Sequence, residues 1–200
     1  MARVNEAIVR SVTPADLAGL VGLIHAHTEY ERAPRPPSTL ADSLPVLLFG
    51  DEPRLHGFVA EIDDRLAGYA TFSVEVSTWR GDFFLHLDCL YLDEGARGLG
   101  IGPQLVERGY ALAARLGVTE LQWQTPEWNV DAIRFYDRFG ATRSRKERYT
   151  LDLPAGESGG GERLGEERAE GGGAATAKRR TLALGARSAR DNAVDPGRHG

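Results

Sequence analysis

The chain has 200 residues, 42% of them hydrophobic and 26% charged, which is the composition of one soluble globular domain. Its 24 Lys and Arg against 29 Asp and Glu give a net charge of −5, with the acidic excess before residue 153; this disfavours a nucleic-acid partner and favours a cationic small-molecule substrate. A single cysteine, no Cys/His cluster with zinc-ligand spacing and no apolar run of the roughly 20 residues that span a bilayer predict a cytoplasmic protein without disulfide, metal or membrane partner.

The first fifty residues predict one strand and two helices. Residues 8–12 alternate apolar and polar side chains, as an edge strand does. Thr13 can cap a helix that has Pro14 at its first position, and a second capped helix is expected over 38–49. Pro45 is placed to kink or shorten that second helix. The apolar face of the first helix consists of Leu17, Leu20, Val21 and Ile24.

Three strands are expected next. Residues 58–62 and 67–76 alternate and are joined by Asp63-Asp64-Arg65, which predicts a hairpin. Residues 85–92 form the third strand. Strict alternation along it puts Leu85, Leu87, Cys89 and Tyr91 on one face, and His86, Asp88, Leu90 and Leu92 on the other.

A glycine-rich run then leads into a helix and another strand. Apolar residues repeat at helical spacing after Pro103, and Gly117 is placed to end the helix. Residues 118–124 predict a strand, which completes a βαβ unit with two parallel strands. The glycine-rich turn therefore lies at the carboxyl end of a strand, where such sheets bind ligands.

The last part of the chain predicts a short helix, a closing element and a tail. Asn129 can cap a helix that reaches about Phe139 and stops at Gly140, and residues 142–153 alternate as a closing strand or hairpin. We expect a domain at 1–154. The segment 155–200 is rich in Gly, Ala, Arg and Glu and too poor in large apolar residues to offset ordering entropy, so we expect it to be disordered.

The motif Arg97-Gly98-Leu99-Gly100-Ile101-Gly102-Pro103 suits a pyrophosphate. Its glycines let the backbone approach a ligand, the helix amino terminus adds partial positive charge, and Arg97 adds a fork of donors. A glycine-rich turn without a ligand is the alternative. No Gly-Lys-Ser/Thr ending follows, as a nucleoside triphosphatase would need, and the next strand lacks the terminal acid of a dinucleotide fold.

Two motifs together resemble the GNAT superfamily of N-acetyltransferases. Arg-x-x-Gly-x-Gly after an alternating strand resembles its coenzyme A signature. The block from Asn129 to Gly140 resembles its downstream segment Asn-x-x-Ala-x-x-Phe-Tyr-x-x-x-Gly. The resemblance implies an α/β fold: a mixed, twisted sheet whose two central parallel strands splay apart, with helices on both faces and acetyl-CoA in the gap.

The same resemblance implies the cofactor site and a homodimer. The residues expected to bind acetyl-CoA are Leu90, Tyr91, Leu92, Arg97, Gly98, Leu99, Gly100, Ile101, Gly102, Pro103, Asn129, Ala132 and Tyr136. Asn129 can equally be only a helix cap.

A finer likeness points to the spermidine/spermine (diamine) branch. It rests on Tyr30-Glu31, Phe49-Gly50, Val59-Ala60-Glu61 and Glu127-Trp128-Asn129. That branch often has two adjacent acids on the strand before the loop, whereas this chain has Asp88-Cys89. The second carboxylate for a polyamine is therefore missing.

For catalysis, the resemblance implies a base, an acid and an oxyanion contact. Asp88 accepts the amine proton through water, Tyr136 protonates the leaving thiolate, and the Leu90 amide bonds the thioester carbonyl. The alternatives are a solvated acid at Asp88 and core packing at Tyr136. The expected acceptor site has aromatic and acidic walls, made of Tyr30, Glu31, Asp88, Glu127 and Trp128, of which Tyr30 and Trp128 can alternatively be packing residues.

The remaining histidines and the cysteine suggest no second site. His25 and His27 are two apart on a helix and share no face, and Cys89 is expected in the core. The sequence thus predicts direct acetyl transfer from acetyl-CoA to a primary amine of a small cationic, polyamine-like or diamine-like substrate. Other acceptors (an amino acid or thialysine, an aminoglycoside, a protein N-terminus) and a non-catalytic coenzyme A sensor stay open.

Overall fold

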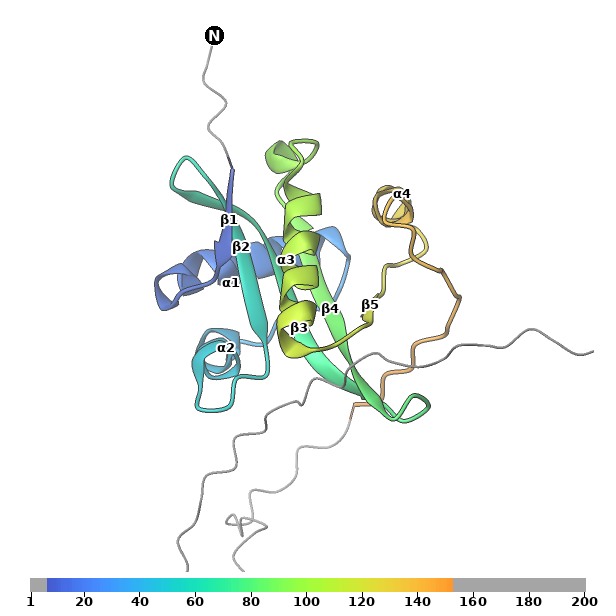
Figure 1. The fold of residues 1–200 in the computed structure, drawn as a ribbon. Helices are drawn as coiled ribbons and strands as arrows, with labels where there is room; N and C mark the ends of the chain where they lie inside the picture. The colour runs from blue at the N-terminus through green and yellow to red at the C-terminus, as the bar shows by residue number, and fades with distance from the viewer. Residues whose placement is uncertain (1–6, 153–200) are drawn as a thin grey trace, which may run out of the picture. The chain divides into compact units, whose positions relative to one another are not determined.

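A five-stranded mixed sheet is the frame of the protein in the computed structural model, which describes residues 7–152 (Figure 1). Its strands follow chain order: β1 (Ile8–Ser11), β2 (His56–Ile62), β3 (Arg65–Ser77), β4 (Asp82–Leu92) and β5 (Leu121–Trp123). The first four pair antiparallel, and β5 pairs parallel to β4, as the βαβ prediction required. The predicted domain end at 154 and the tail 155–200 lie outside the described residues.

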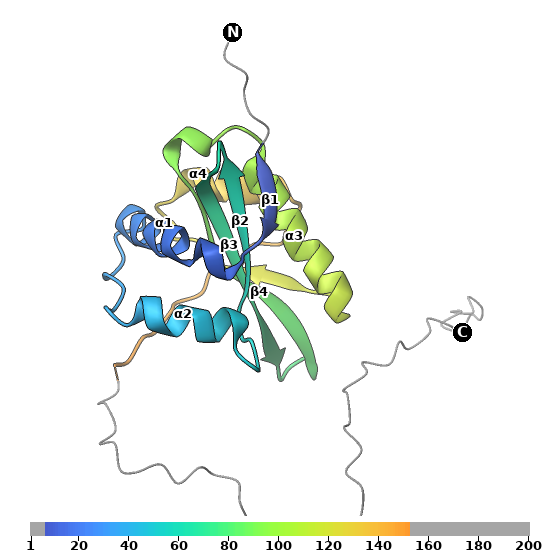
Figure 2. The same ribbon diagram turned by 90° about the vertical axis from the view of Figure 1, so that its left-hand side faces the viewer.

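The helices of the first part of the chain cover both faces of this sheet. They are α1 (Leu17–Tyr30), α2 (Leu40–Phe49) and α3 (Ile101–Leu116), with short 3₁₀ turns η1 (Pro14–Asp16) and η2 (Glu94–Ala96). Figure 1 shows α3 in front of the sheet, and Figure 2, turned by a quarter, shows α1 and α2 on one side of the strands and α3 on the other. This is the predicted layered α/β arrangement.

The hydrophobic core has one layer on each side of the sheet. Toward α1 and α2, a cluster of buried side chains combines Leu20 and Leu23 of α1 with Leu44 and Leu48 of α2 and with Tyr69 of β3. Toward α3, the side chain of Phe72 on β3 lies against Gly109, where a Cβ atom would come within 2.5 Å of the ring. The absent side chain lets α3 approach the sheet closely.

Local chemistry explains where the first helix begins. The backbone N–H of Thr13 and its hydroxyl both donate to Asp16 Oδ2, at 2.8 and 2.7 Å. Arg10 of β1 donates to both carboxylate oxygens of Asp16, and also to Glu61 of β2. These charge-assisted bonds tie β1, η1 and β2 together.

The β2–β3 connection is a tight turn. Asp63 and Asp64 both have positive φ angles, 51° and 60°, as the central residues of a two-residue hairpin turn need. The predicted hairpin is confirmed. The helix α2 also forms as predicted and continues through Pro45.

The second part of the chain contains α4 (Val130–Asp137), and the chain divides into two compact units between Trp128 and Asn129. Within this second unit, Asn129 Oδ1 accepts the Ala132 N–H at 3.2 Å, so the predicted cap is confirmed. Gly140 takes a positive φ of 71° just after the helix.

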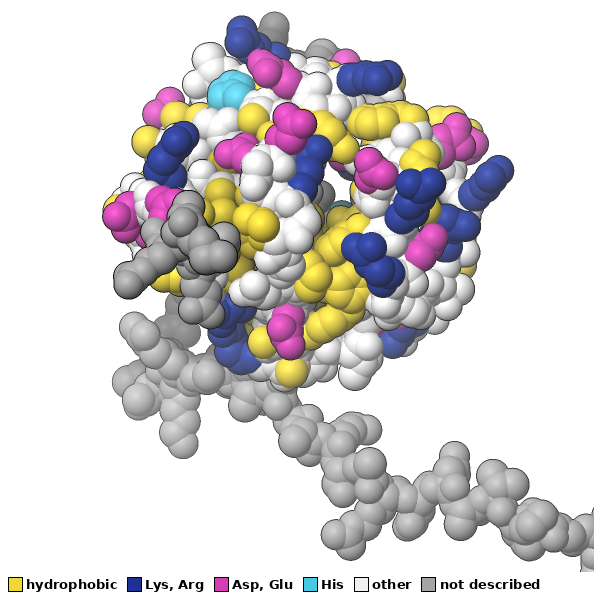
Figure 3. All heavy atoms as spheres, turned by 90° about the horizontal axis from the view of Figure 1, so that it is seen from above, with side chains coloured by type: hydrophobic (Ala, Val, Ile, Leu, Met, Phe, Trp, Pro, Cys, Tyr) yellow, Lys and Arg dark blue, Asp and Glu magenta, His cyan; other side chains and the backbone are white. Residues whose placement is uncertain are grey.

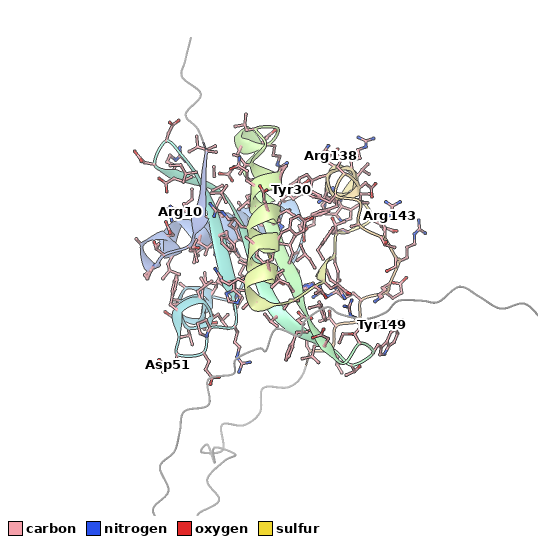
Figure 4. All side chains as sticks on the ribbon, in the orientation of Figure 1. Arg10, Tyr30, Asp51, Arg138, Arg143 and Tyr149 are labelled. Atoms are coloured by element: carbon pink, nitrogen blue, oxygen red, sulfur yellow. The ribbon has the colours of Figure 1, made fainter. Side chains whose placement is uncertain are left out.

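The predicted closing strand is wrong for 142–152, where the structure has no strand. The segment has five charged side chains from Arg143 to Arg148, so its alternation has no apolar face to bury. Tyr149 and Leu151 are 91% and 82% exposed. Figure 4 shows Arg143 and Tyr149 pointing outward from this part of the chain.

No helix among the described residues has the length and apolar character that crossing a membrane requires.

Candidate active site

An extra residue, Asp88, interrupts the regular pairing of β4 with β3. Its neighbours Leu87 and Cys89 pair with Phe72 and Thr71, which are adjacent on β3, so Asp88 has no partner residue on that strand. Such a bulge reverses the alternation of side chains along the strand. Along β4, the alternate side chains that point toward α3 before Asp88 are therefore followed, after Asp88, by alternate side chains that point toward α1.

This bulge overturns one prediction about β4. Leu85 and Leu87 lie on the α3 side with Phe72, whereas Cys89 and Tyr91 pack against the core cluster on the α1 side. The expectation that these four residues share a face is wrong, and the companion set His86, Asp88, Leu90 and Leu92 is divided in the same way. The physical reason is that a period of two cannot be kept across an inserted residue.

The parallel pairing of β4 with β5 stops at the same place. The last pair is Leu87 with Trp123, and β4 continues to Leu92. β5 is also shorter than the predicted 118–124. The backbone of residues 88–92, including the predicted cofactor contacts Leu90, Tyr91 and Leu92, thus extends past the parallel pair, as in a splayed sheet.

The glycine-rich loop follows β4 and leads into α3. Gly98 and Gly100 both have φ of 77°, a conformation that favours glycine, and a Cβ atom added to either would meet no atom within 4 Å. Gly102 and Pro103 lie in the first turn of α3, whose N-terminus has no side-chain cap, and Leu99 is half exposed. An open backbone, uncapped helix amides and a neighbouring arginine fit the pyrophosphate of coenzyme A.

Arg97 lies over an aromatic ring of α1. Its Nε donates to the Leu92 carbonyl at 3.1 Å, and its guanidinium carbon is 4.5 Å from the centre of the Tyr30 ring and 5.9 Å from that of Tyr91. These are cation–π distances. The predicted cofactor arginine is thus next to a predicted acceptor residue.

Tyr30, the last residue of α1, belongs to a group of aromatic rings within the first compact unit, which ends at Trp128. Its centroid lies 6.3 Å from Tyr91 and 6.1 Å from Trp128, and Arg32 lies over the Trp128 ring at 5.1 Å. We call Tyr30, Tyr91 and Trp128 the aromatic group. The predicted residues Tyr30 and Trp128 are brought together, and Tyr91 joins them.

A buried histidine behind this group was missed as a site residue. His27 Nδ1 is 2.8 Å from the Tyr69 hydroxyl, its ring stacks on Tyr91 at 5.1 Å, and its Nε2 is 3.6 Å from Glu31. The Tyr69 hydroxyl and the Glu31 carboxylate thus lie at the two ring nitrogens of His27. The spacing of four residues between His27 and Glu31 on one helix is the sequence signal that could have predicted this contact.

His27 changes the pKa of the neighbouring Glu31 carboxyl group. The polar contact with His27 lowers the pKa of Glu31, against the opposing effect of burial. Glu31 is therefore a carboxylate at neutral pH beside Tyr30. Glu127 lies on the surface.

Asp88 is exposed and contacts the thiol next to it. The Cys89 sulfur is 3.6 Å from Asp88 Oδ2. Burial, and then the Asp88 charge, raise the pKa of Cys89 to about 12; burial and the neighbouring Cys89 also raise the pKa of Tyr69. Cys89 is a protonated, half-buried thiol, in line with its predicted packing role.

The second unit holds the remaining predicted site residues. Tyr136 lies in α4 with its ring edge-on to Phe135, at 5.0 Å, and Phe135 packs in turn on Phe139. Asn129 is buried and caps the same helix, with Ala132 as the donor.

A cavity and the distribution of charged side chains are the surface features outside the glycine loop. An open cavity of about 530 Å³ is lined by η1, α1 and the β2–β3 hairpin, including Asp16, Gly19 and Glu61, and not by the glycine loop. On the face in Figure 3, basic and acidic side chains are interspersed. Within residues 7–152, no group of three or more His, Cys, Asp or Glu is arranged to hold a metal ion.

Known proteins share this sequence pattern. Residues 20–141 match the Acetyltransferase (GNAT) family. A thialysine N-epsilon-acetyltransferase of Caenorhabditis elegans is 32% identical over 127 residues, which are 64% of this chain and 78% of that protein. A human spermidine/spermine N(1)-acetyltransferase-like protein 1 is 27% identical over 100 residues, 46% of this chain and 14% of that protein.

The fold is shared with solved structures. An aminoglycoside acetyltransferase from an uncultured soil metagenomic sample superposes with a TM-score of 0.62 at 20% identity, covering 74% of this chain and 97% of that one. The fold, the loop and these likenesses define an acyl-CoA-dependent N-acetyltransferase. The chain belongs to the GNAT family, whose members use acetyl-CoA as co-substrate.

Proposed function

We propose that this enzyme transfers an acetyl group directly to a primary amine of a small cationic acceptor, of the thialysine or diamine type. The observation that carries this proposal is the aromatic group beside the Glu31 carboxylate, where a guanidinium already lies on the Tyr30 ring. Ring faces and a carboxylate both attract alkylammonium groups. The C. elegans relative supports thialysine first, because it matches most of both chains.

The chain's own residues would bind and activate the reactants as follows. Acetyl-CoA supplies an activated acetyl thioester. The glycine loop and Arg97 hold its pyrophosphate, and the Leu90 N–H donates to the thioester carbonyl as negative charge develops there. Asp88 attracts the ammonium and accepts its proton through water, since only a neutral amine is nucleophilic.

Tyr136 is the proposed proton donor to the coenzyme A sulfur. Tyr136→Phe should lower kcat about 10- to 100-fold and leave the Kd for acetyl-CoA nearly unchanged, because the hydroxyl acts only as sulfur leaves. Steady-state assays of thiol release and calorimetric titration measure the two quantities. Tyr149→Phe, which changes an exposed tyrosine of the same unit, is the matched control.

A non-catalytic coenzyme A sensor is the competing function. A sensor has no turnover for Tyr136→Phe to lower. If the wild-type protein binds acetyl-CoA but releases no thiol with any amine tested, the sensor is favoured and the transfer proposal fails.

Asp88 is tested through pH. In Asp88→Asn the proton must leave without the carboxylate, so kcat/KM should fall at least about tenfold at pH 7 and recover at higher pH, where more of the amine is neutral. Asp51→Asn removes an exposed loop acid as control. An unchanged pH–rate profile in Asp88→Asn would remove Asp88 from the mechanism.

The acceptor itself is tested by competition. Purified enzyme with acetyl-CoA is assayed for thiol release with thialysine, ornithine, putrescine, spermidine, an aminoglycoside and a peptide amino terminus. We expect the highest kcat/KM for thialysine or a short diamine. A preference for the peptide or the aminoglycoside contradicts the proposed acceptor class and leaves the transferase activity intact.

We also propose a homodimer, from the likeness of the motifs alone, and a cytoplasmic location, from the single cysteine. Sedimentation equilibrium should give twice the 21.8 kDa mass of one chain. A single-chain mass at micromolar concentration contradicts this.

A further inference from the structure

The Arg97 guanidinium lies over the Tyr30 ring, and under the proposed function it also binds the coenzyme A pyrophosphate at the adjacent glycine loop. Its Nε is bonded to Leu92 and its guanidinium carbon is 4.5 Å from the Tyr30 centroid. Arg97 also begins the loop whose open glycines fit a pyrophosphate. A bidentate bond to a phosphate on the loop needs the guanidinium plane turned toward that ligand, so we infer that the position over Tyr30 and the position on the loop are alternative placements of this side chain.

The two uses differ in strength. Charge-assisted, bidentate bonds from arginine to a phosphate are strong, while attraction to a ring face at a partly exposed site is weak. Tyr30 is 38% exposed, which places its ring at such a site. An anionic ligand on the loop therefore draws Arg97 from the ring.

We propose that Arg97 covers the acceptor's cation-binding site on Tyr30 and Tyr91 in the free enzyme, and that it uncovers this site when its guanidinium engages the pyrophosphate of coenzyme A. This inference rests on the proposed function and deepens it. It assigns a site for an alkylammonium group and couples that site to the cofactor loop.

The rings that remain are fixed for a new cation. Tyr91 is held by stacking on the buried His27, which in turn is bonded to Tyr69. Tyr30 packs between Tyr91 and Trp128. The Glu31 carboxylate, adjacent to Tyr30 and held by His27, supplies negative charge when the guanidinium leaves.

Arg32 provides an internal comparison. It too lies over a ring of the aromatic group, Trp128, at 5.1 Å. It follows the end of α1 and is not in the glycine loop, so it is not among the residues expected to bind a pyrophosphate. Changing Arg32 should leave the coupling intact, while changing Arg97 should abolish it.

The expected consequence is reciprocal binding. If coenzyme A uncovers the acceptor site, then the acceptor must tighten coenzyme A binding by the same factor. We expect a factor of about 5 or more. Pantetheine, which lacks the pyrophosphate, should produce no such effect.

The test is calorimetric titration of thialysine into the full-length protein alone, with saturating coenzyme A, and with saturating pantetheine. In wild type and Arg32→Gln, coenzyme A should lower the thialysine Kd about fivefold or more. In Arg97→Gln, coenzyme A should bind more weakly and change the thialysine Kd by less than about twofold. Circular dichroism checks that the variants are folded.

A second variant needs no acceptor. In Tyr30→Leu the ring no longer holds Arg97, so coenzyme A should bind a few-fold tighter than to wild type; Tyr149→Leu is the control. This arm stands even if no amine is ever acetylated, so it separates failure of this inference from failure of the proposed function. Equal coupling in Arg97→Gln and wild type, no coupling in wild type, or unchanged coenzyme A affinity in Tyr30→Leu each overturns the inference.

Discussion

Cys89 lies next to the proposed base Asp88, yet its surroundings suppress its reactivity. Burial and the Asp88 charge raise its pKa to about 12, far above the roughly 8.5 of a free thiol. The thiolate fraction at pH 8 is therefore very small. We expect iodoacetamide to label the folded protein at least about 100-fold more slowly than the chain in guanidinium chloride, followed by mass spectrometry.

The same residue bears on the mechanism. Cys89→Ala should retain kcat within about threefold, because a protonated thiol is a poor nucleophile and transfer is proposed to be direct. Rapid labelling of the native protein together with loss of turnover in Cys89→Ala would instead indicate an acyl-enzyme.

At the residue scale, the sequence indicates which residue types could act at a site, but not which residues they contact. Tyr30, Glu31 and Asp88 were picked out by their motifs, but His27 was set aside because its spacing from His25 suits no metal. Its partners are Tyr69, 42 positions away, and Tyr91. A helical pattern shows which residues share a face of one helix, and it does not show what that face meets.

At the scale of elements, two helix glycines should respond oppositely to one substitution. Gly109→Ala on α3 puts a Cβ within 2.5 Å of the fully buried Phe72 ring and should lower the free energy of unfolding by about 1–3 kcal/mol. Gly22→Ala on α1 meets no atom within 4 Å and should raise it by about 0.5–1 kcal/mol, because alanine loses less backbone entropy.

Urea unfolding of both variants measures these changes under one set of conditions. Helix propensity alone favours alanine at both positions. Equal stabilisation of the two variants would therefore mean that α3 does not pack on Phe72 as closely as described.

Element identity was largely predictable, and element limits were less so. Thr13, Asn129 and Gly117 mark helix ends through local bonds, which is why those ends were found. The strand expected over 142–153 failed in its described part because alternation needs an apolar face and a partner strand.

At the scale of the whole molecule, Arg10 links three elements and should set the response to acid. Its bonds lower the pKa of Asp16, so this carboxylate contributes stability above its unfolded pKa of about 4, and the contribution is lost as pH falls. Arg10→Gln should lower the free energy of unfolding at pH 7 by about 1–3 kcal/mol. The difference from wild type should shrink toward pH 2.

Urea titrations at several pH values measure this dependence. Arg54→Gln breaks an exposed pair with Glu52 and should cost less than about 0.5 kcal/mol at any of them. A constant difference between Arg10→Gln and wild type from pH 7 to pH 2 would contradict the role of Asp16.

The sequence by itself determined the α/β class, the glycine-rich turn before α3 and the capped helices, because each depends on residues close together in the chain. The tertiary structure decided which side chains face each other. The bulge at Asp88 exists only in the register of β4 against β3, and Arg97 meets Tyr30 only because α1 ends beside the loop that follows β4. Pairing and packing across long separations depend on the whole fold, which no local pattern encodes.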